Sequence, residues 1–396
     1  MNVYYISPEN RYGEQYFSFS NDFRRIAFEI DQNPQSILKY SDLPVINYLL
    51  SDCDSTAIKR TEYLEALSYG DPGVLLASPG PSLSGLMLRE LGLPEQIDRF
   101  YRMIKENKMR TFFALTEPKK GSDASEIETQ LIKNNKNYFL EGIKCFFGNG
   151  VVAETGVVLA RFARSPIAIR AIWLTPDILQ DTTIEKIPLP MYALRGAQIA
   201  AMQFNQTSIP HEQILGHHLS ACENGLLGVI KVFNRLRTGV GALAIGQAQA
   251  VYDITYQLHQ ENFTCFKSQF YTLNQLLKTA RHILHNAAKK VDRDPLVSAD
   301  VSLAKANATN AAETVIQQCV DLCTLDQLIE NPWLMKAYRD VFCWEFMEGT
   351  THLQKKQIAR NIPTFISELK CELRAELSGA SECWRADAKN SVLNSH

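Results

Sequence analysis

The spacing of apolar residues divides the chain into three stretches of different character. In the first, apolar side chains between residues 22 and 30 recur every three or four positions, which predicts a helix. Ser55 or Thr56 is placed to begin another helix that runs through Ala66. A piece rich in glycine and proline, residues 70–82, breaks the helical pattern. We therefore predict an N-terminal helical domain over residues 1–112.

The middle stretch has the pattern of short strands. A β-type run at 138–140 ends at Glu141-Gly142, a second run covers 157–160, and residues 168–174 alternate before a Thr-Pro-Asp turn. Short strands separated by turn residues are typical of a small antiparallel sandwich or barrel. We predict a middle antiparallel β domain over residues 113–218.

The third stretch returns to helical spacing. Its longest apolar stripe predicts a buried helix, and three further helices are expected over residues 273–291, 301–322 and 334–347. The fold class is therefore α+β and mainly α, with a C-terminal helical bundle over residues 219–365 and a polar tail over 366–396. The stripe consists of Leu226, Ile230, Phe233, Leu236, Val240 and Leu243.

Composition excludes several classes of function. The 41 basic and 43 acidic side chains nearly cancel, which argues against a nucleic-acid scaffold or a polybasic membrane anchor. Nine cysteines without a CxxC pair indicate cytosolic thiols rather than disulfides or a metal site. No segment approaches the roughly 20 apolar residues of a membrane span, and the first residues do not resemble a secretory signal. We expect a cytoplasmic protein whose partner is a small molecule or another protein.

The candidate with the clearest chemistry is Glu348, within the run FMEGTTHLQK at 346–355. Apolar neighbours and the Gly349-Thr350 pair predict that it leaves a buried helix end and faces an apolar space. Poor solvation would raise the pKa of its carboxyl and suit it to act as a general base. Gly349 would let a ligand approach the backbone closely. The alternative is a plain helix break in which Thr350 caps the next helix.

Two loops of the middle stretch offer binding groups. The run FALTEPKKGSD at 113–123 is polar and broken by glycine and proline, so it exposes hydroxyl and N–H groups to a ring edge or a phosphate. The run EGIKCFFGNG at 141–150 places aromatic residues beside glycines and could form a flat wall. Both runs could equally be tight turns between strands.

Together these three stretches resemble the acyl-CoA dehydrogenase family, and the resemblance covers residues 55–362. Residues 116–129 are similar to the family's TEPxxGSDxxxxxT segment, and residues 142–150 to its NGxKxxITNG segment. Residues 348–350 match the EGT in which the family's catalytic base lies. The resemblance implies removal of the α-proton of an acyl thioester by Glu348 and transfer of the β-hydride to FAD.

The resemblance also implies binding roles and an assembly. The thioester would be linked to CoA or to a carrier protein, and the chain would form a homodimer or a homotetramer; the electron acceptor is not specified. The substrate would contact Ser122, Arg237 and Gly349. The flavin would contact Leu115, Thr116, Phe146, Phe147, Gly148, Thr350 and Gln354.

Several positions depart from the family pattern. Gly148 stands where the family usually has a threonine that touches the flavin, and Phe146 replaces a tryptophan. Residues 261–266 replace an arginine and a Phe-Gly pair that reach the FAD pyrophosphate of a neighbouring subunit, and residues 323–326 replace a glycine-rich cradle. These changes predict a weaker grip on the ADP half of FAD. The second hypothesis is a flavin-poor relative that uses Glu348 for non-redox proton transfer or serves as a scaffold.

Overall fold

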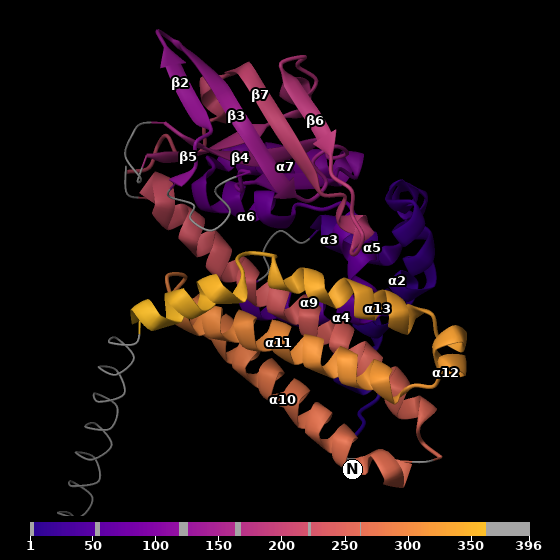
Figure 1. The fold of residues 1–396 in the computed structure, drawn as a ribbon. Coiled ribbons are helices and arrows are strands. Elements are labelled where there is room, and N and C mark those ends of the chain that lie inside the picture. The colour runs from indigo at the N-terminus through magenta and orange to yellow at the C-terminus, as the bar shows by residue number, and fades with distance from the viewer. Residues whose placement is uncertain are drawn as a thin grey trace, which may run out of the picture.

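The computed structural model describes residues 4–51, 56–118, 126–162, 168–220, 223–261 and 263–361. Two helical regions flank a β domain, and the helices of the C-terminal region form a bundle beneath it (Figure 1). Ser122, Asn262 and the predicted tail at 366–396 lie outside the described residues.

The N-terminal region is helical because its apolar residues recur on one face of each helix and its helix starts carry capping side chains. Phe19, Phe23 and Ile26 of α2 are buried at such spacing. Thr56 caps α4 by accepting a hydrogen bond from the Lys59 N–H, as the sequence predicted. The helices are α1 (Pro8–Tyr12), α2 (Glu14–Gln32), η1 (Pro34–Tyr40), α3 (Pro44–Ser51), α4 (Ala57–Gly70), α5 (Pro72–Ala77), α6 (Ser82–Leu91) and α7 (Pro94–Asn107).

The β domain is a seven-stranded sheet in the order β1-β4-β2-β3-β7-β6, with β5 paired to β4. Short helices α8 (Pro176–Leu179), η3 (Arg195–Ala197) and η4 (His211–Gln213) connect parts of it. Its strands are β1 (Thr111–Ala114), β2 (Gln130–Asn134), β3 (Asn137–Phe147), β4 (Thr155–Arg161), β5 (Ile169–Leu174), β6 (Ile184–Pro188) and β7 (Ala200–Ile209).

The sheet is mixed, where the sequence predicted an antiparallel one. β1 runs parallel to β4, and β2 meets β4 in parallel through one residue pair; the remaining pairs are antiparallel. Parallel neighbours need a long connection, and the β2–β3 hairpin supplies one between β1 and β4. β3 also continues through the expected break at Glu141-Gly142. Gly142 takes a φ of +138° there and forms a bulge, so the strand bends instead of ending.

The C-terminal region packs around α9, which is buried over most of its length. The predicted helix at 334–347 is shorter than expected, because the α-helix ends at Asp340 and tightens into a 3₁₀ turn before Glu348. A last helix covers residues 351–361. The other elements are η5 (Glu223–Leu227), α9 (Gly228–Leu258), α10 (Phe263–Arg293), α11 (Ala299–Leu322), α12 (Leu325–Glu330), α13 (Trp333–Asp340) and η6 (Val341–Glu345).

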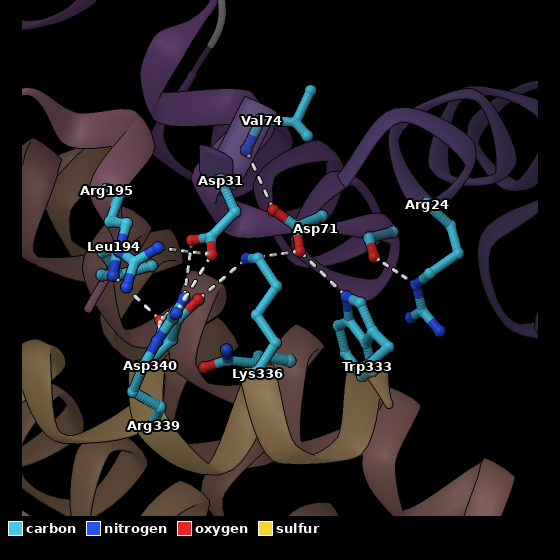
Figure 2. A network of polar contacts seen from close by, with 12 residues as sticks. Arg24, Asp31, Asp71, Val74, Leu194, Arg195, Trp333, Lys336, Arg339 and Asp340 are labelled. Carbon is cyan, nitrogen blue, oxygen red and sulfur yellow. Dashed lines mark hydrogen bonds and ion pairs between the residues drawn. The ribbon is translucent and has the colours of Figure 1, made fainter. Parts of the chain in front are cut away.

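A buried polar junction joins α13 to the rest of the molecule (Figure 2). Lys336 lies between Asp71, which caps α5, and Asp340, with Nζ 2.8 Å from a carboxylate oxygen of each. Asp340 also accepts a hydrogen bond from the Leu194 N–H just before η3. Arg339 reaches Asp31 of α2 at 2.6 Å. The junction therefore fixes the start of the segment that leads to Glu348 against the N-terminal helices and the β domain.

Within the described ranges, no helix combines the length and apolar character needed to cross a membrane. The longest helices carry polar side chains throughout: α9 buries Asn234, Gln247 and Asp253 inside the bundle. Such residues are placed to hydrogen-bond within a packed protein core.

Candidate active site

The segment of residues 345–350, called the base turn here, connects η6 to the last helix and carries Glu348. Glu348 has a φ of +54° and Gly349 a φ of +94°, so two successive residues occupy the left-handed region. At Gly349 a Cβ would come within 2.9 Å of Gln354 Nε2, so both the conformation and the space favour glycine. Thr350 Oγ1 accepts a long bond of 3.4 Å from the Leu353 N–H. The threonine contact that the alternative expected is therefore present in the turn that carries Glu348.

Side chains from three helices hold the carbonyl groups of the base turn. Lys305 of α11 donates from Nζ to the carbonyl oxygens of Glu345 at 3.0 Å and Gly349 at 2.9 Å. Arg237 of α9 donates from Nε to the Glu348 carbonyl at 3.1 Å. Gln354 Nε2 lies 3.1 Å from both the Glu348 and the Gly349 oxygens. The backbone around the base is thus fixed from outside the turn.

The carboxyl of Glu345 completes this arrangement from within the segment. It accepts the N–H of Thr351 at 2.7 Å and also the hydroxyl of the same residue. Anionic acceptors are favourable at the N-terminus of a helix, where N–H groups have no partner within the helix. Glu345 therefore ties η6 to the helix at 351–361 and closes the base turn.

Desolvation controls the charge of this site. Burial raises the pKa of Glu348 to about 7, while the positive charges of Arg237 and Lys305 act in the opposite direction and limit the rise. Burial likewise lowers the pKa of Lys305 to about 8, against the pull of Glu345 and Glu348. Glu348 as a residue is half-buried, while its carboxyl group is desolvated. A carboxyl with a pKa near neutrality is suited to take up and release a proton.

A second cluster lies at the end of β1. Lys144 of β3 is fully buried and donates to the Leu115 carbonyl at 2.9 Å and to Glu117 at 2.7 Å. The Cys145 N–H donates to the Thr116 carbonyl at 2.9 Å. Burial lowers the pKa of Lys144 to about 8, although Glu117 opposes this. These contacts fix Leu115 and Thr116 beside the end of β3.

The two phenylalanines of the predicted wall have different environments. Phe146 has a φ of +58° and an exposed fraction of 65%, so its ring faces outward. Phe147 is 5% exposed and packs on Phe112, with ring centroids 5.4 Å apart, inside the core of the β domain. Gly148 is half-buried, and a Cβ there would lie 3.1 Å from the Ala197 carbonyl. The wall available to a ligand therefore consists of Phe146 and the Gly148 backbone, with Phe147 supporting it from behind.

Aromatic packing connects the two clusters. Phe113 of β1 meets Phe233 of α9 with ring centroids 5.8 Å apart, and the guanidinium of Arg237 lies 5.5 Å from the centroid of the same ring. Arg237 in turn bonds the carbonyl of Glu348. Phe233 and Arg237 thus form a chain of contacts between β1 and the base turn.

The structure places the predicted site residues in two groups, one at the base turn and one at the ends of β1 and β3, and it adds residues that sequence reasoning missed. Ser122 lies outside the described ranges, so its placement is not given. Lys305 and Glu345 were not predicted. The signal for Lys305 was a single lysine among alanines at 304, 306 and 308, on a face of α11 that proves to be buried. A lone lysine at such a position needs a buried partner, and the base turn supplies it.

Comparison with known proteins finds matches over most of the chain. Residues 112–207 match the family model "Acyl-CoA dehydrogenase, middle domain", and residues 223–362 match "Acyl-CoA dehydrogenase, C-terminal domain". The 3-(aryl)acrylate reductase of Clostridium sporogenes is 25% identical over 74% of this chain and 79% of its own.

Solved structures show the same fold over nearly the whole molecule. Butyryl-CoA dehydrogenase of Megasphaera elsdenii has a TM-score of 0.75 at 21% identity, covering 91% of this chain and 98% of that one. The prolyl acyl carrier protein oxidase AnaB also has a TM-score of 0.75, at 17% identity, covering 88% and 99%.

Proposed function

This chain belongs to the acyl-CoA dehydrogenase family, and from that membership and the site geometry we propose that it catalyses α,β-dehydrogenation of an acyl thioester with Glu348 as the base. The observation that supports this most directly is the base turn. Its one free carboxyl has a pKa raised to about 7 by burial and a backbone held by Lys305, Arg237 and Gln354. At neutral pH such a carboxylate can accept a proton from a carbon acid without being permanently protonated.

Members of this family bind FAD, and the residues of this chain fit the ring end of that cofactor. Phe146 has a left-handed backbone conformation, and its aromatic ring is exposed instead of packed in the core. It lies next to Gly148, which has no side chain to keep a ligand away from the backbone. Leu115 and Thr116 lie alongside, held by Lys144 and Cys145. When bound, FAD would accept the hydride released from the β-carbon.

The residues of the chain have separate tasks in this reaction. A carboxylate oxygen of Glu348 takes the α-proton, and the electron pair of that C–H bond forms the new double bond as the β-hydride leaves. The α-proton is acidic only if the thioester carbonyl is polarised by hydrogen-bond donors. The C=O and N–H of a trans peptide point in opposite directions, so the Gly349 N–H points away from Arg237 and Gln354. We assign this N–H to the substrate side of the turn.

The substrate class includes thioesters of CoA and of carrier proteins. The structural neighbour AnaB is named as an oxidase of a prolyl acyl carrier protein, which supports a carrier-bound acyl or aminoacyl group as a substrate here. Arg237 and Ser122 are proposed as substrate contacts, and Arg237 also holds the Glu348 carbonyl, so it would link substrate binding to the position of the base. A homodimer or homotetramer is the proposed assembly.

Anaerobic titration of the purified protein tests this proposal. After reconstitution with FAD, a small set of thioesters is added, including butyryl-CoA and prolyl-loaded carrier protein, and the flavin absorbance is followed. We expect one class to bleach the flavin, with an equivalent amount of α,β-unsaturated product detected by mass spectrometry. The non-redox alternative would be favoured if the protein binds no FAD, or if none of the thioesters bleaches the FAD that it has bound.

A further inference from the structure

The conformation of the base turn requires an external restraint. A non-glycine residue in the left-handed region is unfavourable by roughly 1 kcal/mol or more, and Glu348 is followed by a second residue with positive φ. The helix on either side does not impose this conformation, since η6 ends at Glu345 and the next helix begins at 351. Contacts from other elements must therefore stabilise it.

Lys305 supplies a restraint on both sides of the base. Its two carbonyl partners, Glu345 and Gly349, flank Glu348 in the sequence, so one ammonium group spans the base turn. The side chain is 0% exposed, so without these two hydrogen bonds its charge would have no water to solvate it. Burying a lysine is costly, and this lysine recovers the cost only when the carbonyl groups converge on it. The turn and the lysine thus stabilise each other.

The charge of Lys305 also acts on the base. The titratable and charged groups that face it are Arg237 from α9, Glu313 from α11, and Glu345 and Glu348 from the base turn and its start. Glu348 itself is influenced by Arg237 and Lys305, both of which favour its ionised form against burial. Arg237 would remain after loss of Lys305, so the effect of the lysine can be measured separately.

We propose that Lys305 is a positioning residue for the dehydrogenation: its ammonium group locks the base turn that carries Glu348 and holds a positive charge at that turn. This inference rests on the proposed function for its catalytic part, while its structural part can be tested without turnover. A purely structural lysine would affect stability alone. Loss of a positioning lysine would change both the protection of the turn's amides from hydrogen exchange and the pH at which the base becomes active.

The first experiment follows amide hydrogen exchange in peptides that cover residues 345–354, with Lys305→Met compared against Lys290→Met. Lys290 also pairs with α11, through Asp300 at 2.7 Å, but on an exposed surface outside the site. We expect exchange in these peptides to rise about tenfold in Lys305→Met, as for loss of a charged hydrogen bond, and to be unchanged in Lys290→Met. Unchanged exchange in Lys305→Met would overturn the locking role.

The second experiment measures kcat/KM against pH in the FAD-loaded protein. The acid limb is the part of the profile where kcat/KM falls at low pH because Glu348 becomes protonated. Removal of a neighbouring cation favours the neutral carboxyl, so this limb should move to higher pH by about one unit in Lys305→Met. Below the limb, kcat/KM should then be about tenfold lower than in the wild type. Lys305→Arg, which keeps the charge, should restore the wild-type limb. An acid limb that stays in place in Lys305→Met would overturn the electrostatic role.

These outcomes separate failure of the inference from failure of the proposed function. If the wild-type protein dehydrogenates no thioester, the proposed function fails, yet the exchange experiment still reports on the base turn. If Lys305→Met does not fold, Lys305→Gln takes its place, because it keeps an N–H donor without the charge. That variant should still shift the acid limb, and a wild-type limb there would count against the proposal.

Discussion

The base turn and the segment of residues 323–330, called the cofactor-end segment here, are stabilised by different kinds of contact. The base turn is held by side chains of α9, α11 and the last helix. The cofactor-end segment combines a local cap with a bond to α9. Thr324 and Gln327 form a reciprocal capping box at the start of α12, and Gln327 Nε2 also donates to the Leu258 carbonyl at 3.4 Å. Leu325 and Ile329, with exposed fractions of 73% and 66%, face away from the bundle core.

This difference teaches which part of the family's machinery the chain retains. The resemblance places a glycine-rich cradle for the FAD pyrophosphate at residues 323–326, but the structure has a capped helix start there, with Asp326 in its first turn. An acidic side chain disfavours a phosphate nearby. The base turn is therefore held by charged and amide side chains of other helices, whereas the cofactor-end segment is a capped helix start that lacks the expected glycines and has a long side-chain bond to α9.

Removing one remote anchor should therefore cost more than removing a local cap. Lys336→Met leaves Asp71 and Asp340 buried without their shared cation, and the expected loss of unfolding free energy is about 3–5 kcal/mol. Thr324→Ala, the matched variant in the cofactor-end segment, should lose only about 1 kcal/mol. Urea unfolding of both variants measures this, and equal losses would mean that the buried junction leading to the base turn stabilises the protein no more than the local cap of the cofactor-end segment.

The base turn should also carry the chemistry. Glu348→Gln keeps the shape of the side chain and removes its ability to accept a proton, so turnover should fall by at least ~100-fold. FAD uptake and the circular dichroism spectrum should remain as in the wild type. Glu313→Gln is the control, because Glu313 is a nearby carboxyl on α11 that lies outside the base turn and also has a pKa raised by burial. Near-normal turnover in Glu348→Gln would remove this residue from the mechanism.

Burial of Glu348 should appear in the stability of the cofactor-free protein. The pKa of Glu348 is about 7 in the folded state against an ordinary 4.5, so between these pH values the folded protein holds a proton that the unfolded chain releases. Unfolding free energy should consequently fall as pH rises from about 4.5 to 7, by about 1–3 kcal/mol from this group. Glu348→Gln should remove that fall, and the gap between the two proteins should be constant above pH 7.

A control with the opposite sign is available at Glu29. A hydrogen bond from Tyr40, followed by one from Lys39, lowers the pKa of Glu29, so its contribution is lost as pH falls. Glu29→Gln should therefore differ from wild type mainly at higher pH and lose stability there. Lys305 titrates at about 8, above the range used for Glu348. If Glu348→Gln follows the wild-type pH dependence between 4.5 and 7, the carboxyl is solvated in the folded state.

Sequence reasoning could propose Glu348 and the two loops because the features that mark them lie on neighbouring residues. The apolar flanks of Glu348 and the glycine after it are sufficient to expect a desolvated carboxyl at a chain reversal. Lys305 could not be predicted in the same way, since its partner carbonyls are 40 and 44 residues away and backbone groups leave no trace in the sequence. The parallel pairing of β1 with β4 was missed for the same reason, because it depends on tertiary contacts rather than on local propensity.

Phe146 and Phe147 illustrate a different reason for a partial prediction. Two adjacent aromatic residues in a strand point to opposite faces, so both cannot line one wall. The burial of Phe147 against Phe112 follows from this alternation. The orientation of Phe146 depends in addition on its left-handed backbone, which the sequence did not indicate.

The smallest expected effect concerns the grip on FAD at the cofactor end. Asn262, outside the described residues, occupies the position of the family's pyrophosphate-binding arginine. Each lost charged contact is worth roughly 1.5–3 kcal/mol, so wild-type FAD should dissociate on dilution and Asn262→Arg should tighten it by about tenfold. Gln260→Arg adds the same charge two residues away and controls for general attraction. Calorimetry that finds tight wild-type binding and no gain in Asn262→Arg would mean that other residues hold the ADP half, and that the cofactor end is no weaker than the base side.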